Sequence, residues 1–339
     1  MKKSTLALSI TTLGCMCLAT AAPFDWTGNT NTDWSTASNW DPTNVPNLTG
    51  IDNAFVSGTT VYNAANGDFI ISTGSTLTIQ NGGNWSQTNG IAWIKMQGGT
   101  LTIESGGIFD TGTAQNLERP GGGTFNVSGT FNINTSFAFG IGTNQTLNLT
   151  GGDLTVATGD FIVSDNGVFN MTGGSAIFPN HVIINADTST LSFGGGTTTI
   201  TNELKPNAGL NGASIGGGAT VNATLISFDG GDTNSLDVAD GRLNISNGTS
   251  FNGIFTAGGD DYVNLTTISS EVFIDNLTEG GSITLLSDGR LRFNDAIGNI
   301  VATPLGDGYL FTAIPEPSTY ALLFGAMTLS VLVLRRRKA

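Results

Sequence analysis

Few residues in this chain of 339 could carry out chemistry. Two carboxylate pairs, Asp229 with Asp232 and Asp260 with Asp261, could act as acid and base in glycoside hydrolysis if the groups lay about 5–9 Å apart. Because Gly-Gly-Asp turns are ordinary polar corners, we expect both pairs to be structural. A polysaccharide lyase would need an Arg or Lys base beside calcium-binding carboxylates. The available cations lie in no evident Asp-rich stretch: Lys95, Arg119, Lys205, Arg242, Arg290 and Arg292.

Nucleophilic and metal-binding side chains are equally scarce. The single histidine, His181, is expected in a loop or on a strand face. Both cysteines, Cys15 and Cys17, lie near the N-terminus, so the rest of the chain has no disulfide, thiolate or Cys-based metal site. The glycine runs lack the Lys and helix of a phosphate loop, and no calcium-binding nonapeptide recurs. We therefore expect no enzyme activity and no cofactor, apart from weak calcium binding at the surface.

The charge balance limits the possible partners. Residues 22–314 contain six Lys and Arg against 25 Asp and Glu, a net charge of −19. Such a body repels nucleic acid and anionic lipid, so we expect no nucleic-acid partner. Charged residues make up only 11% of the chain, which is low for a globular enzyme.

The N-terminal segment, residues 1–21, has the pattern of a signal peptide. The cations of Met1–Lys3 precede the apolar stretch Leu6–Ala19. Ala19 and Ala21 fit the small-residue pattern before a cleavage site, so we expect signal peptidase to cut after Ala21 and the body to be exported.

The C-terminal segment, residues 314–339, has the pattern of a membrane anchor. An apolar run extends from Tyr320 to Leu334, and a helix of this length spans roughly 22 Å against a hydrocarbon core of ~30 Å. Snorkelling side chains can cover part of the difference. The cations that follow are expected to stay cytoplasmic, with the body outside: Arg335, Arg336, Arg337 and Lys338. The alternative is a buried amphipathic helix.

Pro315, Glu316 and Pro317 stand before this run, and the two prolines favour an extended, accessible segment. Motif, apolar helix and terminal Arg cluster together resemble the PEP-CTERM sorting domain of Gram-negative bacteria. The resemblance covers about 26 residues. It implies recognition of Pro315, Glu316 and Pro317 by an exosortase, a membrane protease-transpeptidase, with possible release to the cell surface or extracellular matrix.

Between the termini the chain repeats itself. Short segments alternate apolar and polar residues, which is the period of a strand with one buried face. From Leu77 the key apolar positions recur at regular intervals, namely at Leu101, Phe125, Leu147, Phe169 and Leu191. The next clear step, from Leu191 to Val221, is longer, which indicates an insertion around Lys205–Ala213. Glycine pairs between the segments suit tight corners.

This period predicts an all-β fold, a right-handed parallel β-helix over residues 52–276. A single turn would bury too little apolar surface to offset its ordering entropy, whereas a stack shares core and hydrogen bonds. The alternative is an antiparallel β-sandwich, whose hairpins favour Asn-Gly turns. Asn66-Gly67, Asn89-Gly90, Asn166-Gly167 and Asn247-Gly248 do occur, but not at hairpin spacing.

Both ends of the stack need covers, because open strand edges aggregate. Residues 22–51, with Trp26, Trp34 and Trp40, are predicted to form an N-terminal cap; a carbohydrate-stacking platform is the alternative reading. The opening also resembles W-x-G…W…N-W…P segments of secreted bacterial β-repeat proteins. Residues 277–313 are predicted to form a C-terminal β cap, with strands at 282–286, 290–293 and 309–311 and hairpin turns at Asp288-Gly289 and Asp307-Gly308.

Two functions fit this organisation. The first is a non-enzymatic surface or matrix protein with a structural or adhesive role. The second is an extracellular protein that binds or degrades polysaccharide, with matrix exopolysaccharide as partner. The second predicts an outward cluster of aromatic and charged residues, for instance near Trp85, Trp93 and Lys95. Outward faces lined only by Thr, Ser and Asn favour the first.

Overall fold

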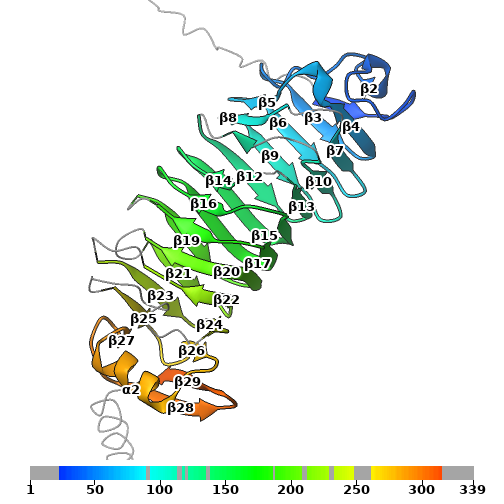
Figure 1. The fold of residues 1–339 in the computed structure, drawn as a ribbon. Coiled ribbons are helices and arrows are strands. Elements are labelled where there is room, and N and C mark those ends of the chain that lie inside the picture. Colours follow the sequence, from blue (N-terminus) through cyan, green and yellow to red (C-terminus); the bar gives the residue numbers. More distant parts are fainter. Residues whose placement is uncertain are drawn as a thin grey trace, which may run out of the picture.

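The computed structural model describes residues 23–88, 92–112, 117–118, 121–134, 138–185, 188–207, 212–228, 233–247 and 261–314. They form an elongated all-β structure, a parallel β-solenoid (Figure 1). The predicted all-β class and parallel solenoid are confirmed. The predictions on Ala19, Ala21, Pro315–Pro317, the Tyr320–Leu334 run and the Arg335–Lys338 cluster lie outside the described residues.

The strands form three faces, and on each face most strands pair in parallel with their counterparts one turn away. The first face holds β3 (Asn53–Val56), β6 (Thr76–Ile79), β9 (Thr100–Ile103), β12 (Gly123–Val127), the first parts of β15 (Gln145–Val156) and β17 (Val168–Phe178), β19 (Thr190–Phe193), β21 (Ala213–Gly216), β23 (Ser235–Ala239), β25 (Tyr262–Leu265) and β27 (Leu291–Phe293). The second holds β4 (Thr59–Asn63), β7 (Asn84–Thr88), β10 (Ile108–Asp110), β13 (Thr130–Ile133), the second parts of β15 and β17, the first parts of β20 (Thr197–Pro206) and β22 (Thr220–Ile226), β24 (Arg242–Ile245) and β26 (Glu271–Ile274).

The third face is made of two groups of shorter strands. One group is β5 (Phe69–Ser72), β8 (Ile94–Gln97) and β11 (Leu117–Glu118). The other is β14 (Phe139–Ile141), β16 (Phe161–Val163), β18 (Val182–Ile184) and the last parts of β20 and β22. Short 3-10 turns lie at η1 (Ala37–Asn39) and η2 (Ala64–Asn66).

The predicted insertion around Lys205–Ala213 is wrong. Ala213 in β21 pairs with Leu191 in β19, so the first face continues with its regular period. Lys205 belongs to β20 on the third face, where it pairs with Ile183. The longer step to Val221 arose because Val221 lies on the second face. All faces share the same alternation of apolar and polar residues, so this pattern alone does not assign a strand to a face.

The core is a stack of inward side chains that repeat from turn to turn. Leu77, Leu101 and Phe125 occupy matching positions on the first face and are fully buried. On the second face Trp85 stacks on Phe109 with ring centroids 4.2 Å apart and planes at 4°. Trp85 is fully buried, so it cannot belong to an outward cluster with Trp93 and Lys95, and that prediction is wrong.

The N-terminal segment closes its end of the stack with tryptophans. β1 (Pro23–Trp26) pairs in parallel with β3 and antiparallel with β2 (Trp40–Asp41). All three indoles are buried, Trp34 packs edge-on against Phe69 at 5.2 Å, and the Trp40 Nε1 donates to the Trp34 carbonyl. The indoles therefore cover the first turn and leave no open face on which a sugar could stack.

The C-terminal segment contains a helix where a strand was predicted. Residues 282–286 lie in α2 (Glu279–Ser287), and Asp288 and Gly289 end this helix instead of forming a hairpin turn. Thr278 starts the helix, because its Oγ1 accepts from the Gly281 N–H. A short apolar run is compatible with either element, and this cap decides between them. The hairpin near Asp307 is confirmed, with β28 (Ile300–Leu305) antiparallel to β29 (Gly308–Ala313).

No helix within the described part of the chain is long and apolar enough to cross a membrane.

Candidate functional site

The carboxylate pairs considered for hydrolysis do not form a described site. Asp229, Asp232, Asp260 and the cation Arg119 lie outside the described residues. Asp261 is buried, and its Oδ1 accepts from the backbone N–H and side-chain amide of Asn234 at 2.8 and 3.1 Å. This carboxylate serves to hold neighbouring turns together.

Lys95 is also used within the fold. Its Nζ lies 2.9 Å from Asp68 and 5.9 Å from the Trp93 ring centroid. The hydrogen bond from the Trp93 N–H and then the Lys95 ammonium lower the pKa of Asp68. The pair is a local surface contact between successive turns of the third face.

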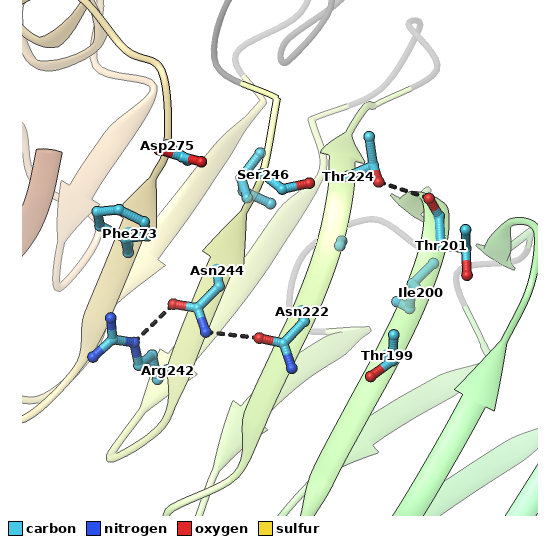
Figure 2. Close-up of a pocket in the computed structure, with 12 residues that line it drawn as sticks. Thr199, Ile200, Thr201, Asn222, Thr224, Arg242, Asn244, Ser246, Phe273 and Asp275 are labelled. Carbon is cyan, nitrogen blue, oxygen red and sulfur yellow. Dashed lines mark hydrogen bonds between the residues drawn. The ribbon is translucent and has the colours of Figure 1, made fainter. Parts of the chain in front are cut away.

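A concave surface of ≈ 480 Å³ forms a groove on the outside of the second face (Figure 2). We call it the Arg242 groove. It crosses β20, β22, β24 and β26, because Thr199, Asn222, Asn244 and Phe273 hold matching outward positions on these strands. Further lining residues are Ile200, Thr201, Ala223, Thr224, Arg242, Ile245, Ser246 and Asp275.

Arg242 anchors one side of the groove. Its Nη1 lies 3.0 Å from the Glu271 carboxylate, and its Nε donates to the Asn244 Oδ1 at 2.7 Å. The Asn244 amide in turn donates to the Asn222 Oδ1 at 2.8 Å. The guanidinium carbon also lies 5.9 Å from the Phe273 ring centroid. The result is a chain of hydrogen bonds that begins at Arg242, beside the aromatic ring, and runs to Asn222.

This arrangement suits an uncharged ligand rich in hydroxyl groups. Amide and hydroxyl side chains both donate and accept hydrogen bonds. Glu271 offsets the charge of Arg242, and Asp275 adds a negative charge, so the groove does not favour an anion. Strands about 4.8 Å apart present these groups at regular intervals along the coil.

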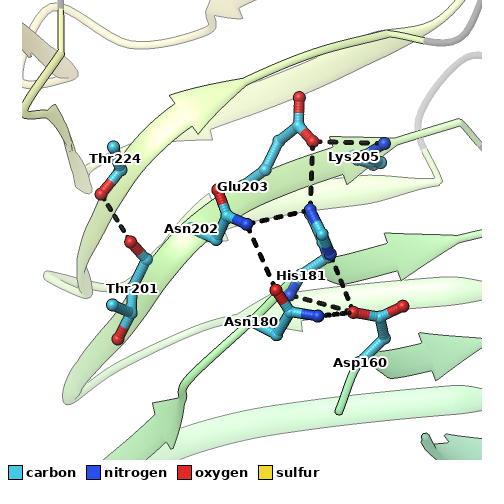
Figure 3. Close-up of polar contacts among 8 residues, drawn as sticks. All are labelled: Asp160, Asn180, His181, Thr201, Asn202, Glu203, Lys205 and Thr224. Carbon is cyan, nitrogen blue, oxygen red and sulfur yellow. Dashed lines mark hydrogen bonds and ion pairs between the residues drawn. The ribbon is translucent and has the colours of Figure 1, made fainter.

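A second polar cluster surrounds His181 at the corner between the second and third faces (Figure 3). The His181 Nδ1 lies 2.8 Å from the Asp160 Oδ1, and its Nε2 lies 3.5 Å from the Glu203 Oε2. The Asn202 amide is 3.1 Å from the same Nε2, and Lys205 pairs with Glu203 at 3.2 Å. With the proton on Nδ1, the ring donates to Asp160 and accepts from Asn202.

The His181 cluster has the wrong geometry for a metal centre. The two ring nitrogens point to different carboxylates on opposite edges of the ring, so the groups do not converge on one point. Across the described ranges there is no group of three or more His, Cys, Asp or Glu side chains that could hold an ion. The cluster adjoins the Arg242 groove, because Thr224 Oγ1 donates to the carbonyl of Thr201 next to Asn202.

A third cluster lies on the first face near the C-terminal end. The Tyr262 hydroxyl donates to the Asp295 Oδ1 at 2.9 Å, and the Arg292 guanidinium lies 3.8 Å from the Tyr262 ring centroid. Burial and the bond to Asp295 raise the pKa of Tyr262 to about 12. Burial also raises the pKa of Asp237, and the negative charge of Asp295 adds to this effect. These contacts tie the last turns of the first face together.

Sequence reasoning considered Arg242 and His181 singly and missed the groups around them. Asn222 and Asn244 were visible as the third residues of two successive repeat segments, and Arg242 stands where most segments have Thr. That change of residue type within a repeat is a usable signal. No family model, curated protein or solved structure matches this chain.

Proposed function

We propose that this chain is an exported, non-enzymatic protein of the cell surface or extracellular matrix, with a structural or adhesive role. The N-terminal segment serves export through signal peptidase, and residues 314–339 serve exosortase sorting and membrane anchoring. The coil is right-handed, as parallel strand crossovers nearly always are. The body binds no nucleic acid and no cofactor beyond weak surface calcium.

One observation carries the structural role, namely the uncharged outer rows of the first face. Outward positions from β9 to β19 hold only Thr, Asn, Ser and Val. Within them Asn148 donates to Asn126 at 3.0 Å, and Asn170 donates to Asn148 at 3.3 Å. Such rows strengthen contacts between turns and present an uncharged, mostly polar surface, which suits a spacer or adhesive rod.

The sorting proposal is tested by the mass of the mature C-terminus in cells with and without a functional sorting protease. Loss of the residues beyond Pro315–Pro317 only in the presence of the protease is the expected result. An intact Ala339 in both strains would contradict sorting and leave the tail as an anchor. Surface biotinylation of the same cells tests whether the body is outside.

A second candidate function is binding or degradation of an extracellular polysaccharide, and the Arg242 groove favours binding. Its paired charges, amides, hydroxyls and half-buried Phe273 match the needs of a neutral glycan with polar edges and apolar ring faces. Affinity electrophoresis in gels that contain the matrix polysaccharide of the producing cells tests this function directly. Unchanged mobility would contradict it.

A further inference from the structure

The outer surface of the second face changes character at its C-terminal end. β29 extends this face by pairing antiparallel with β26, and β28 pairs with β29. Residues directly opposite each other in an antiparallel pair share one side of the sheet. Phe273, Leu310 and Thr303 therefore lie in one outward line, and Glu271, Thr312 and Val301 lie in the next.

The hairpin formed by β28 and β29 is apolar on this outward side. By strand alternation Val301 and Leu305 share it with Leu310 and Ile314. Val301, Leu305 and Ile314 are 41%, 47% and 44% exposed, and Leu310 is half-buried. Two neighbouring strands thus present four aliphatic side chains that the described fold does not cover. We call this set the hairpin patch.

Chain length places this patch near the start of the tail. Ile314 is itself part of the patch, and the apolar run begins at Tyr320. Six residues span at most about 20 Å when fully extended. If the run inserts in a bilayer, Ile314 cannot lie further than this from the hydrocarbon boundary, and the rest of the patch extends from it along the hairpin. The run is also shorter than the hydrocarbon core is thick, which draws its outer end inward.

We propose that the hairpin patch is a lipid-contact surface. It holds the solenoid against the bilayer into which the uncleaved tail inserts. The inference rests on the proposed anchoring role of residues 314–339. Contact is apolar and not electrostatic, because a body with a net charge of −19 gains nothing from anionic headgroups. This lipid contact would also hold Pro315–Pro317, which directly follow the patch, at the membrane surface where a membrane protease acts.

Spin labels test the proposal, since the chain beyond Cys17 contains no cysteine and each new one is unique. The full mature chain is reconstituted in phosphatidylcholine vesicles with one nitroxide label in each of three variants. Leu305→Cys reports on the patch, Met327→Cys on the tail, and Ile51→Cys, 57% exposed in the N-terminal part, on bulk solvent. Power saturation with oxygen and with a polar nickel complex measures lipid and water access.

The expected result is lipid access at positions 305 and 327 and water access at position 51. Combining Val301→Asp with the Leu305→Cys label should return that label to water while the tail stays inserted. Water access at position 305 with lipid access at position 327 overturns lipid contact by the hairpin patch and leaves the anchoring role of the tail intact. Water access at 327 refutes the anchoring role and this inference with it. A third outcome is that the label at position 305 is shielded from both oxygen and the nickel complex and that the protein has a doubled mass in lipid-free solution. This outcome assigns the patch to contact with a second copy of the chain and overturns the proposal.

Discussion

The middle of the solenoid, from β9 to β19, and its last turns, from β22 to β29, share one coil but differ in their outward residues. In the middle, Asn148 and Asn170 are matched one regular period apart in uncharged rows. At the end, the chain between matched positions such as Leu243 and Val272 is longer, and charges gather around Arg242. Parallel register places matching positions of successive turns next to one another. A charge repeated at one position would therefore lie about 4.8 Å from a charge of the same sign. Charged groups therefore occur where the residue type changes from one turn to the next, as around Arg242 and in the His181 cluster.

The largest expected effect is on the core of the repeated region. Trp85→Ala should lower the stability of the full chain by about 3–5 kcal/mol, because it removes the ring stacked on Phe109. The matched variant is Trp85→Phe. The Trp85 Nε1 is buried with no partner among the described residues, so removing it offsets part of the lost contact area. Urea unfolding midpoints compare the two, and equal losses for both variants would contradict this account.

The corners of the middle turns should be nearly as sensitive. Gly174 has φ +82°, and a Cβ there would lie 2.0 Å from the Gly152 carbonyl oxygen of the preceding turn. Gly174→Ala should therefore cost about 1–3 kcal/mol. Gly151→Ala is the matched control, because no heavy atom lies within 4 Å of a Cβ at that position. Urea unfolding should show a loss of stability for Gly174→Ala and none for Gly151→Ala. Equal losses in the two variants would contradict this account of the corners.

At the end of the coil the largest effect should be on binding. Arg242→Ala breaks the chain of contacts to Asn244 and Glu271. If the Arg242 groove holds a neutral glycan, we expect about a tenfold loss of affinity, equivalent to about 1.4 kcal/mol. Asn148→Ala in the middle row should leave affinity unchanged and lower stability by about 0.5–1.5 kcal/mol, because it removes the hydrogen bonds to Asn126 and Asn170. Titration calorimetry with matrix oligosaccharides measures the affinities, urea unfolding measures the stability, and equal losses of affinity would remove the distinction between the regions.

The smallest effect should be a pH dependence at the end of the coil. Because burial raises the pKa of Asp237 in the folded state, folding binds a proton between the ordinary and the raised pKa. The contribution of Asp237 to stability therefore falls as pH rises through this window and stays constant above it. Asp237→Asn keeps an oxygen to accept from Asn264 and should remove this slope. Thermal unfolding of both proteins from pH 4 to pH 7 checks the sign, and a variant that loses stability at neutral pH would contradict it.

Much of the fold follows from local patterns. Alternation around Leu77 and Leu101 predicts strands with one buried side, and the regular spacing predicts a stack. The tryptophans before the first repeat predict a cover at that end, and Trp26, Trp34 and Trp40 are buried there. The Arg242 groove was harder to predict from the sequence. Phe273 approaches Arg242 only because the strands that hold them pair with each other, and these strands lie a full turn apart along the chain.

The sequence by itself determined the repeat, the inward positions and the scarcity of charge, since these depend on residue type and spacing along the chain. Only the tertiary structure decided that Val221 and Leu243 lie on the second face. The physical reason is that every face of a solenoid has the same two-residue alternation. Which face a strand joins depends on hydrogen bonds to chain segments a full turn away, and no local pattern contains that information.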